Sequence, residues 1–210
     1  MKYKVMIVED QTMPRELFEL RVQSSEHFEV ALSIDNAALT DVYCLRFPVD
    51  LILMDVVTRG GESGLDAAER IKRSFPQIKI IIVTSMPECS YLSRAREIGV
   101  ESFWYKEEQR ESLLDVMERT MAGESVYPDA TPELQLGLTS SYEFTDRVLE
   151  VLRDMTGGDT NSEIAERLNM SVATVKTHIL NMLEKTGFRN RTELAVRARE
   201  SGLVILNRKN

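Results

Sequence analysis

Side chains that could carry out phosphoryl chemistry stand directly after four short apolar runs in the first half of this 210-residue chain. They are Glu9 and Asp10 after the first run, Asp55 after the second, Thr84 after the third and Lys106 after the fourth. If they meet, the carboxylates raise one another's pKa unless a cation lies among them, and Mg²⁺ suits oxygen ligands of this kind. A metal ion, a lysine and a hydroxyl would then surround a transferring phosphoryl group, with Asp55 as the nucleophile that forms an aspartyl phosphate.

The apolar runs have the length and composition of buried strands, and segments with helical spacing separate them. Strands are expected at 4–9, 28–33, 50–55, 79–84 and 102–105, and helices at 14–24, 36–46, 64–74, 90–98 and 109–121. Repeated βα units favour an α/β domain of the flavodoxin-like type, a five-stranded parallel sheet in the order 2-1-3-4-5. The carboxyl ends of its strands share one edge, where the five side chains should converge. The alternative, that the strand-end acids only cap helices, leaves the lysine and the threonine unexplained.

The second half is organised differently. Periodicity fails across 122–142, where glycine, proline, serine and threonine predict a linker. Residues 143–210 predict a small all-α domain of four helices, at 145–156, 160–168, 171–186 and 191–201. Thr160 and Glu163 have the spacing of a capping box, and Asn169 and Met170 alone separate the two central helices. So short a joint forces a sharp crossing, which is the geometry of a helix-turn-helix.

Charge is distributed unevenly along the chain. The net charge is −8, but residues 1–121 carry −6 and the stretch from Asn169 onward carries +5. An acidic front and a basic tail indicate two domains with different partners. There is no apolar stretch of the roughly 20 residues that span a bilayer, and the start has no signal-peptide region. We therefore expect a cytoplasmic protein with no membrane partner and with two reduced cysteines.

The first domain, residues 1–121, resembles the receiver domain of bacterial two-component response regulators. The resemblance rests on the acidic pair, the aspartate, the threonine and the lysine, in that order along the chain. It implies that a sensor histidine kinase transfers a phosphoryl group to Asp55 and that Mg²⁺ is required. Thr84 and Lys106 would bind the new phosphate.

The same resemblance assigns further roles. The metal ligands would be Asp10, Asp55 and the backbone carbonyl of Val57, with Glu9 holding a coordinated water. Phe103 takes the aromatic switch position of the family and would move together with Thr84. The face formed by the fourth helix, the fifth strand and the fifth helix would then rearrange.

The chain departs from the receiver pattern in two places. The loop 56–64 lacks the usual proline and is one residue longer, which predicts an altered loop shape. Glu107 follows Lys106 where the family has a proline, so the customary cis peptide bond is not expected.

Two apolar residues lie where other receivers can orient an attacking water. Val57 and Met86 stand two positions beyond Asp55 and Thr84, and neither can hydrogen-bond a water molecule. They predict a phosphorylated state that is long-lived without an external phosphatase.

A series of motifs fills the helical tail. They are Phe144-Thr145-Asp146-Arg147, Glu150-Val151-Leu152, Asn161-Ser162-Glu163-Ile164-Ala165, Thr174-Val175-Lys176-Thr177-His178 and Asn190-Arg191-Thr192-Glu193-Leu194-Ala195. Residues 144–204 thereby resemble the LuxR-type DNA-binding domain, which together with a receiver defines regulators of the NarL/FixJ type. Val148 and Thr186 depart from the family, which usually has Glu and Leu there.

The third tail helix is amphipathic, with an apolar stripe facing the core and short polar side chains facing outward. The predicted stripe is Val172, Val175, Ile179, Met182 and Leu183. By resemblance, the base-reading residues are Lys176, Thr177 and Leu180, and the phosphate contacts are His178, Lys185 and Arg191. The alternative is a four-helix protein-interaction module, against which the basic tail argues.

Together these features predict a response regulator in which phosphorylation of Asp55 controls promoter binding, with no enzymatic activity beyond its own phosphorylation and dephosphorylation. In the family, the unphosphorylated receiver commonly covers the recognition helix, and phosphorylation frees it for homodimerisation. RNA polymerase is a further expected partner. Two alternatives stay open: an orphan regulator that works without phosphorylation, and a Mg²⁺-dependent phosphotransferase or phosphatase acting on small molecules.

Overall fold

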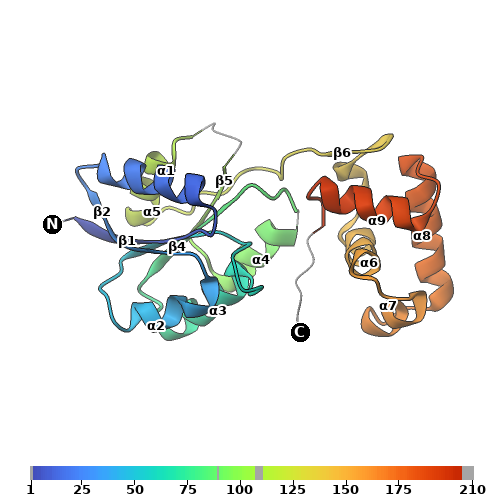
Figure 1. Cartoon of the computed structure of the whole chain (residues 1–210), viewed down its shortest axis with the longest axis horizontal. Coiled ribbons are helices and arrows are strands. Elements are labelled where there is room, and N and C mark those ends of the chain that lie inside the picture. The colour runs from blue at the N-terminus through green and yellow to red at the C-terminus, as the bar shows by residue number, and fades with distance from the viewer. Residues whose placement is uncertain (1, 89, 107–110, 205–210) are drawn as a thin grey trace. The chain divides into compact units, whose positions relative to one another are not determined.

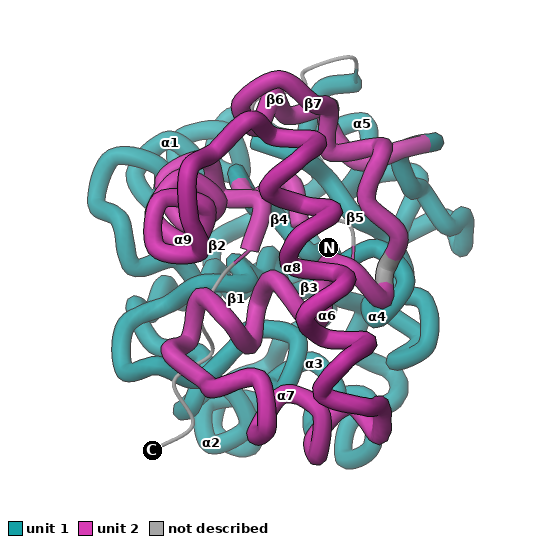
Figure 2. Tube along the Cα trace, turned by 90° about the vertical axis from the view of Figure 1, so that its right-hand side faces the viewer, with its two compact units in different colours: residues 1–85, 91–129, 207–210 teal, residues 86–90, 130–206 magenta. Residues whose placement is uncertain are grey.

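The computed structural model describes residues 2–88, 90–106 and 111–204, and these fall into two compact units (Figure 2). The first unit contains the described residues up to Ser85 and from Tyr91 to Asp129. The second contains those from Ala130 onward, together with residues of the Met86–Ser90 segment. Each unit has a buried hydrophobic core of its own.

The first unit is a five-stranded parallel sheet in the order β2-β1-β3-β4-β5, which confirms the predicted receiver fold (Figure 1). Its strands are β1 (Tyr3–Val8), β2 (Phe28–Ile34), β3 (Leu51–Met54), β4 (Lys79–Thr84) and β5 (Ser102–Tyr105). The central strands are continuous apolar runs because helices cover both of their faces. The register pairs Val8 with Met54 and Thr84 with Tyr105, so neighbouring strands end level with one another.

Helices α1 and α5 lie on one face of this sheet, and α2, α3 and α4 lie on the other (Figure 1). Their bounds are α1 (Thr12–Gln23), α2 (Thr40–Cys44), α3 (Gly64–Ser74), α4 (Ser90–Ile98) and α5 (Leu113–Met121). The second helix is shorter than the predicted 36–46 because Asn36 accepts the Ala38 N–H and caps a separate 3-10 turn, η1 (Ala37–Leu39). Residues 109 and 110 of the predicted fifth helix lie outside the described residues.

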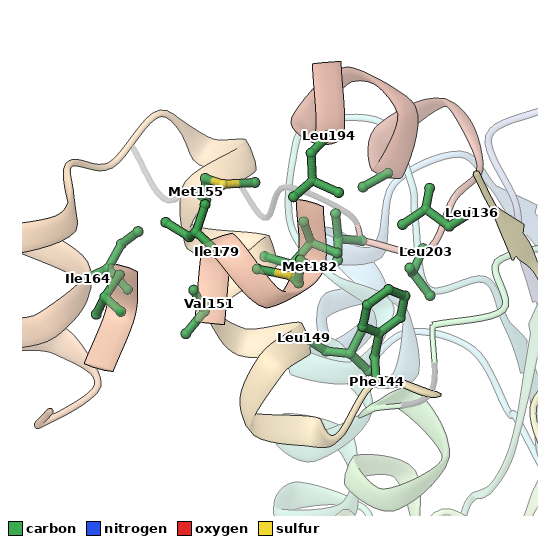
Figure 3. Close-up of a cluster of buried hydrophobic side chains, with 14 of the residues drawn as sticks. Leu136, Phe144, Leu149, Val151, Met155, Ile164, Ile179, Met182, Leu194 and Leu203 are labelled. Atoms are coloured by element: carbon green, nitrogen blue, oxygen red, sulfur yellow. The ribbon is translucent and has the colours of Figure 1, made fainter. Parts of the chain in front are cut away.

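The second unit contains four helices at the predicted places and a hairpin that the sequence did not predict. The helices are α6 (Asp146–Gly157), α7 (Asn161–Arg167), α8 (Val172–Thr186) and α9 (Arg191–Glu200). The hairpin strands are β6 (Gln135–Leu136) and β7 (Thr139–Ser140), followed by a 3-10 turn, η2 (Ser141–Glu143). Figure 3 shows the core that the four helices and the hairpin share, to which Phe144, Leu149, Met182 and Leu194 all belong.

Much of the segment 122–142, predicted as a linker, packs on one unit or the other. The Val126 carbonyl accepts the Phe103 N–H (2.8 Å) and the Val126 N–H donates to Ser102 Oγ (3.1 Å), so the chain runs along β5 here. Farther on, Leu136 is 2% exposed within the core of the second unit. The segment was predicted as a linker because β6 and β7 are too short, and its apolar positions too few, to give a periodic pattern.

Among the described residues, no helix is both long enough and apolar enough to cross a membrane. Cys44 has a free thiol, and burial raises its pKa to about 11. Cys89, the other cysteine, lies outside the described residues.

Candidate functional site

Asp55 follows β3 directly, and the backbone around it fixes its position. Its N–H donates to the carbonyl of Val8 (2.9 Å), the last residue of β1, so the residues after both strands emerge side by side. Gly64 begins α3 so close to this point that a Cβ on it would lie 1.9 Å from the Asp55 carbonyl oxygen. Asp55 is 4% exposed. The side chain is therefore a nearly buried carboxyl group at the shared edge of the sheet.

Lys106 brings a positive charge to Asp55 from the end of β5. Its Nζ donates to Asp55 Oδ2 (2.8 Å) and forms a second ion pair with Glu9 Oε2. Glu9 is fully buried, and its other carboxylate oxygen accepts the N–H of Gln11 (3.1 Å). Glu9, which follows β1, and Lys106, which follows β5, thus meet at the shared edge of the sheet. The direct pairing of Glu9 with Lys106 was not predicted.

The electrostatics of this cluster disfavour a charge on Asp55. Burial raises the pKa of Asp55 to about 6, and the neighbouring Glu9 carboxylate adds to the shift, while Lys106 offsets part of it. The pKa of Lys106 is raised in turn, because Asp55 and Glu9 outweigh the burial of its ammonium group. The cluster therefore contains more negative charge than Lys106 neutralises.

Glu9, Asp10 and Asp55 each present a carboxylate oxygen within 4.8 Å of the others. Glu9 and Asp55 are buried, and Asp10 is half-buried. Convergent oxygens with an excess of negative charge fit a hard divalent cation, and Mg²⁺ in particular. Val57 lies beside this group, with its N–H 3.4 Å from Asp55 Oδ1 and its side chain 37% exposed.

The loop between β3 and α3, which departs from the receiver pattern, is closed and anchored. Val57 forms an antiparallel bridge across the loop to Ser63, and the two glycines at 60 and 61 have positive φ angles of 94° and 84° that turn the chain between them. Thr58 Oγ1 accepts the Ala37 N–H (3.0 Å), which ties the loop to the start of η1. These contacts give the loop a defined shape, although the loop lacks the proline that is usual in receiver domains.

Thr84 ends β4 and is fully buried, and its carbonyl accepts the N–H of Lys106 (2.9 Å). Phe103, the predicted switch residue, lies on β5 and is 1% exposed. Its ring packs against Tyr105, with centroids 5.0 Å apart, and against Tyr127, with centroids 6.3 Å apart. Tyr127 belongs to the predicted linker, so this contact was not predicted. Glu107 lies outside the described residues, as does its peptide bond to Lys106.

A second candidate site is formed by α7 and α8 in the other unit. Thr160 and Glu163 form the predicted capping box, and Ser171 Oγ accepts the Thr174 N–H (3.0 Å) at the start of α8. Between the helices, Asn169 adopts a φ of +50°, a left-handed conformation that asparagine tolerates better than most residues. This tight turn gives the predicted helix-turn-helix.

Helix α8 turns one face to the core and another to solvent. Val175, Ile179 and Met182 are buried, as predicted, whereas Val172 is 39% exposed and the prediction that it faces the core is wrong. Val172 is the first residue of the helix, where the core no longer covers that face. The predicted base-reading residues lie on the exposed face: Lys176, Thr177 and Leu180.

The predicted phosphate contacts differ in their surroundings. His178 is half-buried on α8. Lys185 Nζ donates to the Glu143 carbonyl (3.2 Å) and to its carboxylate (3.3 Å). Arg191 donates to Asn161 Oδ1 (3.2 Å) and to the Asp159 carbonyl (2.9 Å). The two basic side chains would have to exchange these partners for phosphates.

Comparison with known proteins agrees with this division of the chain. The family model described as "Response regulator receiver domain" matches residues 5–118, and the one described as "Bacterial regulatory proteins, luxR family" matches residues 143–198. The response regulator protein VraR of Staphylococcus epidermidis is 31% identical over 211 residues, covering 97% of this chain and all of that protein. VraR of Staphylococcus aureus is 29% identical over 209 residues, with the same coverage.

Solved structures share the fold. RcsB from Salmonella enterica serovar Typhimurium, bound to the promoter rprA with a phosphomimetic, aligns with a TM-score of 0.62 at 18% identity, covering 93% of this chain and 98% of that one. A structure of two RcsB dimers bound to two parallel DNAs aligns with a TM-score of 0.63 at 18% identity, covering 95% and 98%.

Proposed function

Because this chain belongs to the response regulators that join a receiver domain to a LuxR-type DNA-binding domain, we propose how its own residues carry out the two steps of that function. It accepts a phosphoryl group on Asp55 from a sensor histidine kinase and, in response, binds promoter DNA to regulate transcription. It is a transcription regulator and not an enzyme with a separate substrate.

The first step takes place on Asp55. One carboxylate oxygen forms a bond to phosphorus while the bond from phosphorus to the kinase histidine breaks. Lys106 Nζ, 2.8 Å from Asp55 Oδ2, stabilises the negative charge on the transferring group and then on the aspartyl phosphate. The observation that carries this proposal is the buried cluster of Asp55, Glu9 and Lys106 at the shared edge of the sheet.

The acidic group next to Asp55 supports a Mg²⁺ requirement. Glu9, Asp10, Asp55 and the backbone carbonyl of Val57 would hold the ion, whether directly or through water. A bound Mg²⁺ ion would neutralise the phosphate oxygens and the excess carboxylate charge together.

The signal then passes from Asp55 to the rest of the receiver through Thr84 and Phe103. The Thr84 hydroxyl would bind the phosphate, and the buried Phe103 ring would follow the change at the end of β4. These two roles rest on the family resemblance, on the position of Thr84 at the end of β4, and on the burial of both side chains.

The second step takes place on α8. Lys176, Thr177 and Leu180 would read base edges in the major groove, and His178, Lys185 and Arg191 would contact phosphates. The exposure of the first three residues supports this assignment.

We further propose that the phosphorylated protein is a homodimer on two half-sites about one helical turn apart, and that it acts on RNA polymerase from there. Support comes from the solved complexes of RcsB dimers with DNA.

Since a kinase and a promoter are both intracellular partners of such a regulator, we place it in the cytoplasm.

The test is the intact mass of the full chain after incubation with acetyl phosphate and Mg²⁺, with oligomeric state and DNA binding measured in the same samples. We expect one phosphate on the wild type and on the surface control Asp129→Asn, and none on Asp55→Asn. We also expect dimerisation and DNA binding to increase with phosphorylation. DNA binding without any phosphate uptake would contradict the proposal and identify an orphan regulator.

A further inference from the structure

We propose that the hairpin β6–β7 is a clamp for the C-terminal end of α8, with Gly137 and Leu138 as positioning residues for DNA recognition. The inference rests on the proposed function only in taking α8 as the recognition helix. The hairpin lies within the segment 122–142, where the sequence predicted a linker. Its contacts make it an integral part of the second unit.

The first observation is a hydrogen bond that the hairpin donates to the helix end. The last carbonyls of an α-helix have no partner within the helix and need one from outside. At the end of α8, the Leu138 N–H donates to the Thr186 carbonyl (3.0 Å). Gly187, with a φ of +74°, ends the helix and donates its own N–H to the Leu183 carbonyl (2.9 Å). The N–H of Gly187 therefore satisfies one carbonyl of the last turn, and the hairpin satisfies another.

The second observation is how closely the two backbones approach. A Cβ on Gly137 would lie 2.1 Å from the Thr186 carbonyl oxygen and 3.0 Å from the Phe188 ring. Gly137 also has a φ of +63°, as expected for the first residue of a two-residue type II′ turn. Leu138 is 81% exposed, but its side chain reaches Gly187 on the helix cap. Both the turn and the contact with α8 thus require glycine at 137.

The third observation is that the base of the hairpin is fixed to the core that α8 packs against. Leu136 is 2% exposed and belongs to the same cluster as Ile179 and Met182 of α8 (Figure 3). Leu134 and Ser141 close the base, with the Ser141 N–H donating to the Leu134 carbonyl (2.8 Å) and Ser141 Oγ accepting the Leu134 N–H (3.0 Å). The hairpin tip is therefore held by a support that does not depend on α8 alone.

The consequence concerns how well α8 can discriminate between sequences. Base contacts need side chains held in a fixed register on the helix, whereas phosphate contacts tolerate more motion. Fraying of the last turn of α8 loosens the helix next to Leu180, a base-reading residue one turn earlier. It also reaches Lys185, but the phosphate contact proposed for that side chain tolerates more motion. Loss of the clamp should therefore weaken binding to a preferred sequence more than binding to arbitrary DNA.

The test uses the full chain and the variant Leu138→Pro, which removes the N–H donor. We expect hydrogen exchange in the last turn of α8 and through residues 187–189 to accelerate by about 3- to 10-fold, the range expected for one net hydrogen bond. Leu138→Ala keeps the N–H and should exchange like the wild type. Gly137→Ala keeps every N–H but cannot approach Thr186, so it should behave like Leu138→Pro.

The second readout is binding of the acetyl phosphate-treated proteins to a duplex selected from random DNA by the wild type, and to a scrambled duplex. Leu138→Pro and Gly137→Ala should lose about 3- to 10-fold on the selected duplex and much less on the scrambled one, with an unchanged salt dependence. Leu138→Ala should retain the wild-type ratio.

The outcomes separate the clamp from the proposed function. Unchanged exchange at the end of α8 in both variants would overturn the clamp, and so would faster exchange spread equally over α6, α7 and α9. Equal loss on both duplexes would overturn the positioning role. If the wild type selects no DNA, the proposed function of α8 fails, while the exchange measurement still decides whether the hairpin caps the helix.

Discussion

The Asp55 carboxyl group is held where its ionised form is disfavoured. Its pKa in the folded protein is about 6, above the ordinary value of 3.8, because burial and Glu9 outweigh Lys106. The folded state therefore holds this proton more tightly than the unfolded chain does. The stability that protonated Asp55 contributes is complete below about pH 4 and is lost as the pH rises through 6.

This argument predicts that Asp55→Asn is more stable than the wild type at pH 7 when divalent ions are removed with EDTA. The asparagine cannot ionise, so the difference in unfolding free energy should reach at most about 3 kcal/mol at pH 7 and nearly vanish at pH 4. Urea unfolding at pH 4, 5.5 and 7 measures it, with Asp129→Asn as a surface control. A difference that does not change with pH would contradict the prediction.

The apolar side chain of Val57 leads to a separate prediction, about the lifetime of the phosphorylated state. Its apolar side chain is 37% exposed next to Asp55 and cannot orient a water for attack on the aspartyl phosphate. Val57→Asn supplies an amide at the same place without changing the backbone carbonyl. We expect phosphate loss to be about tenfold faster in the variant, less than the 10²–10⁴ that a general base supplies. Intact mass followed over time after removal of acetyl phosphate gives both rates, and equal or slower decay in the variant would refute this role.

At the scale of elements, residues 126 and 127 run alongside β5 although they belong to no helix or strand themselves. The backbone of Val126 bonds to Ser102 and Phe103. The Tyr127 hydroxyl donates to the Val100 carbonyl (2.7 Å), while Arg96 of α4 lies 4.7 Å from the centre of its ring. Burial raises the pKa of Tyr127 to about 12, so the hydroxyl remains a donor at neutral pH.

These contacts predict a graded loss of receiver stability when Tyr127 is changed. Tyr127→Phe leaves the Val100 carbonyl without its donor and should cost about 1 kcal/mol. Tyr127→Ala also loses the ring contacts with Phe103 and Arg96, and should cost about 2–3 kcal/mol. Urea unfolding of the receiver measures both. Tyr142→Phe removes a similar bond to the Thr131 carbonyl in the second unit and should leave the receiver transition unchanged.

The elements that could be predicted from the sequence are those with strong periodicity or explicit caps. Buried strands such as β3 are continuous apolar runs, and Thr160 and Glu163 mark the start of α7. The hairpin β6–β7 has two residues in each strand, so it has no pattern to detect. It is stable because Leu136 enters a core built by distant helices, which local sequence does not reveal.

At the scale of the whole molecule, two units of different class occur in one chain, and the change in periodicity after residue 121 predicted this. The convergence of Asp55 with Lys106 follows from the strand order. Asp55 comes after β3 and Lys106 after β5, and these two strands lie on either side of β4 in one sheet. The pairings of Lys185 with Glu143 and of Arg191 with Asn161 could not be predicted, because they depend on how surface side chains meet across helices. The family resemblance marked these two basic residues as phosphate contacts without revealing these partners.

The clamp on α8 also bears on how such regulators can be recombined. Modular proteins evolve, and are engineered, by joining one input domain to another output domain. A fusion that takes the output part from residue 143, where the match to the luxR family model begins, would discard β6 and β7 and leave the Thr186 carbonyl without its Leu138 donor. A junction at Ala130, where the second compact unit resumes, transfers the hairpin together with the helix that it caps. The output part that keeps the cap on α8 is thus longer than the region matched by the luxR family model by one hairpin.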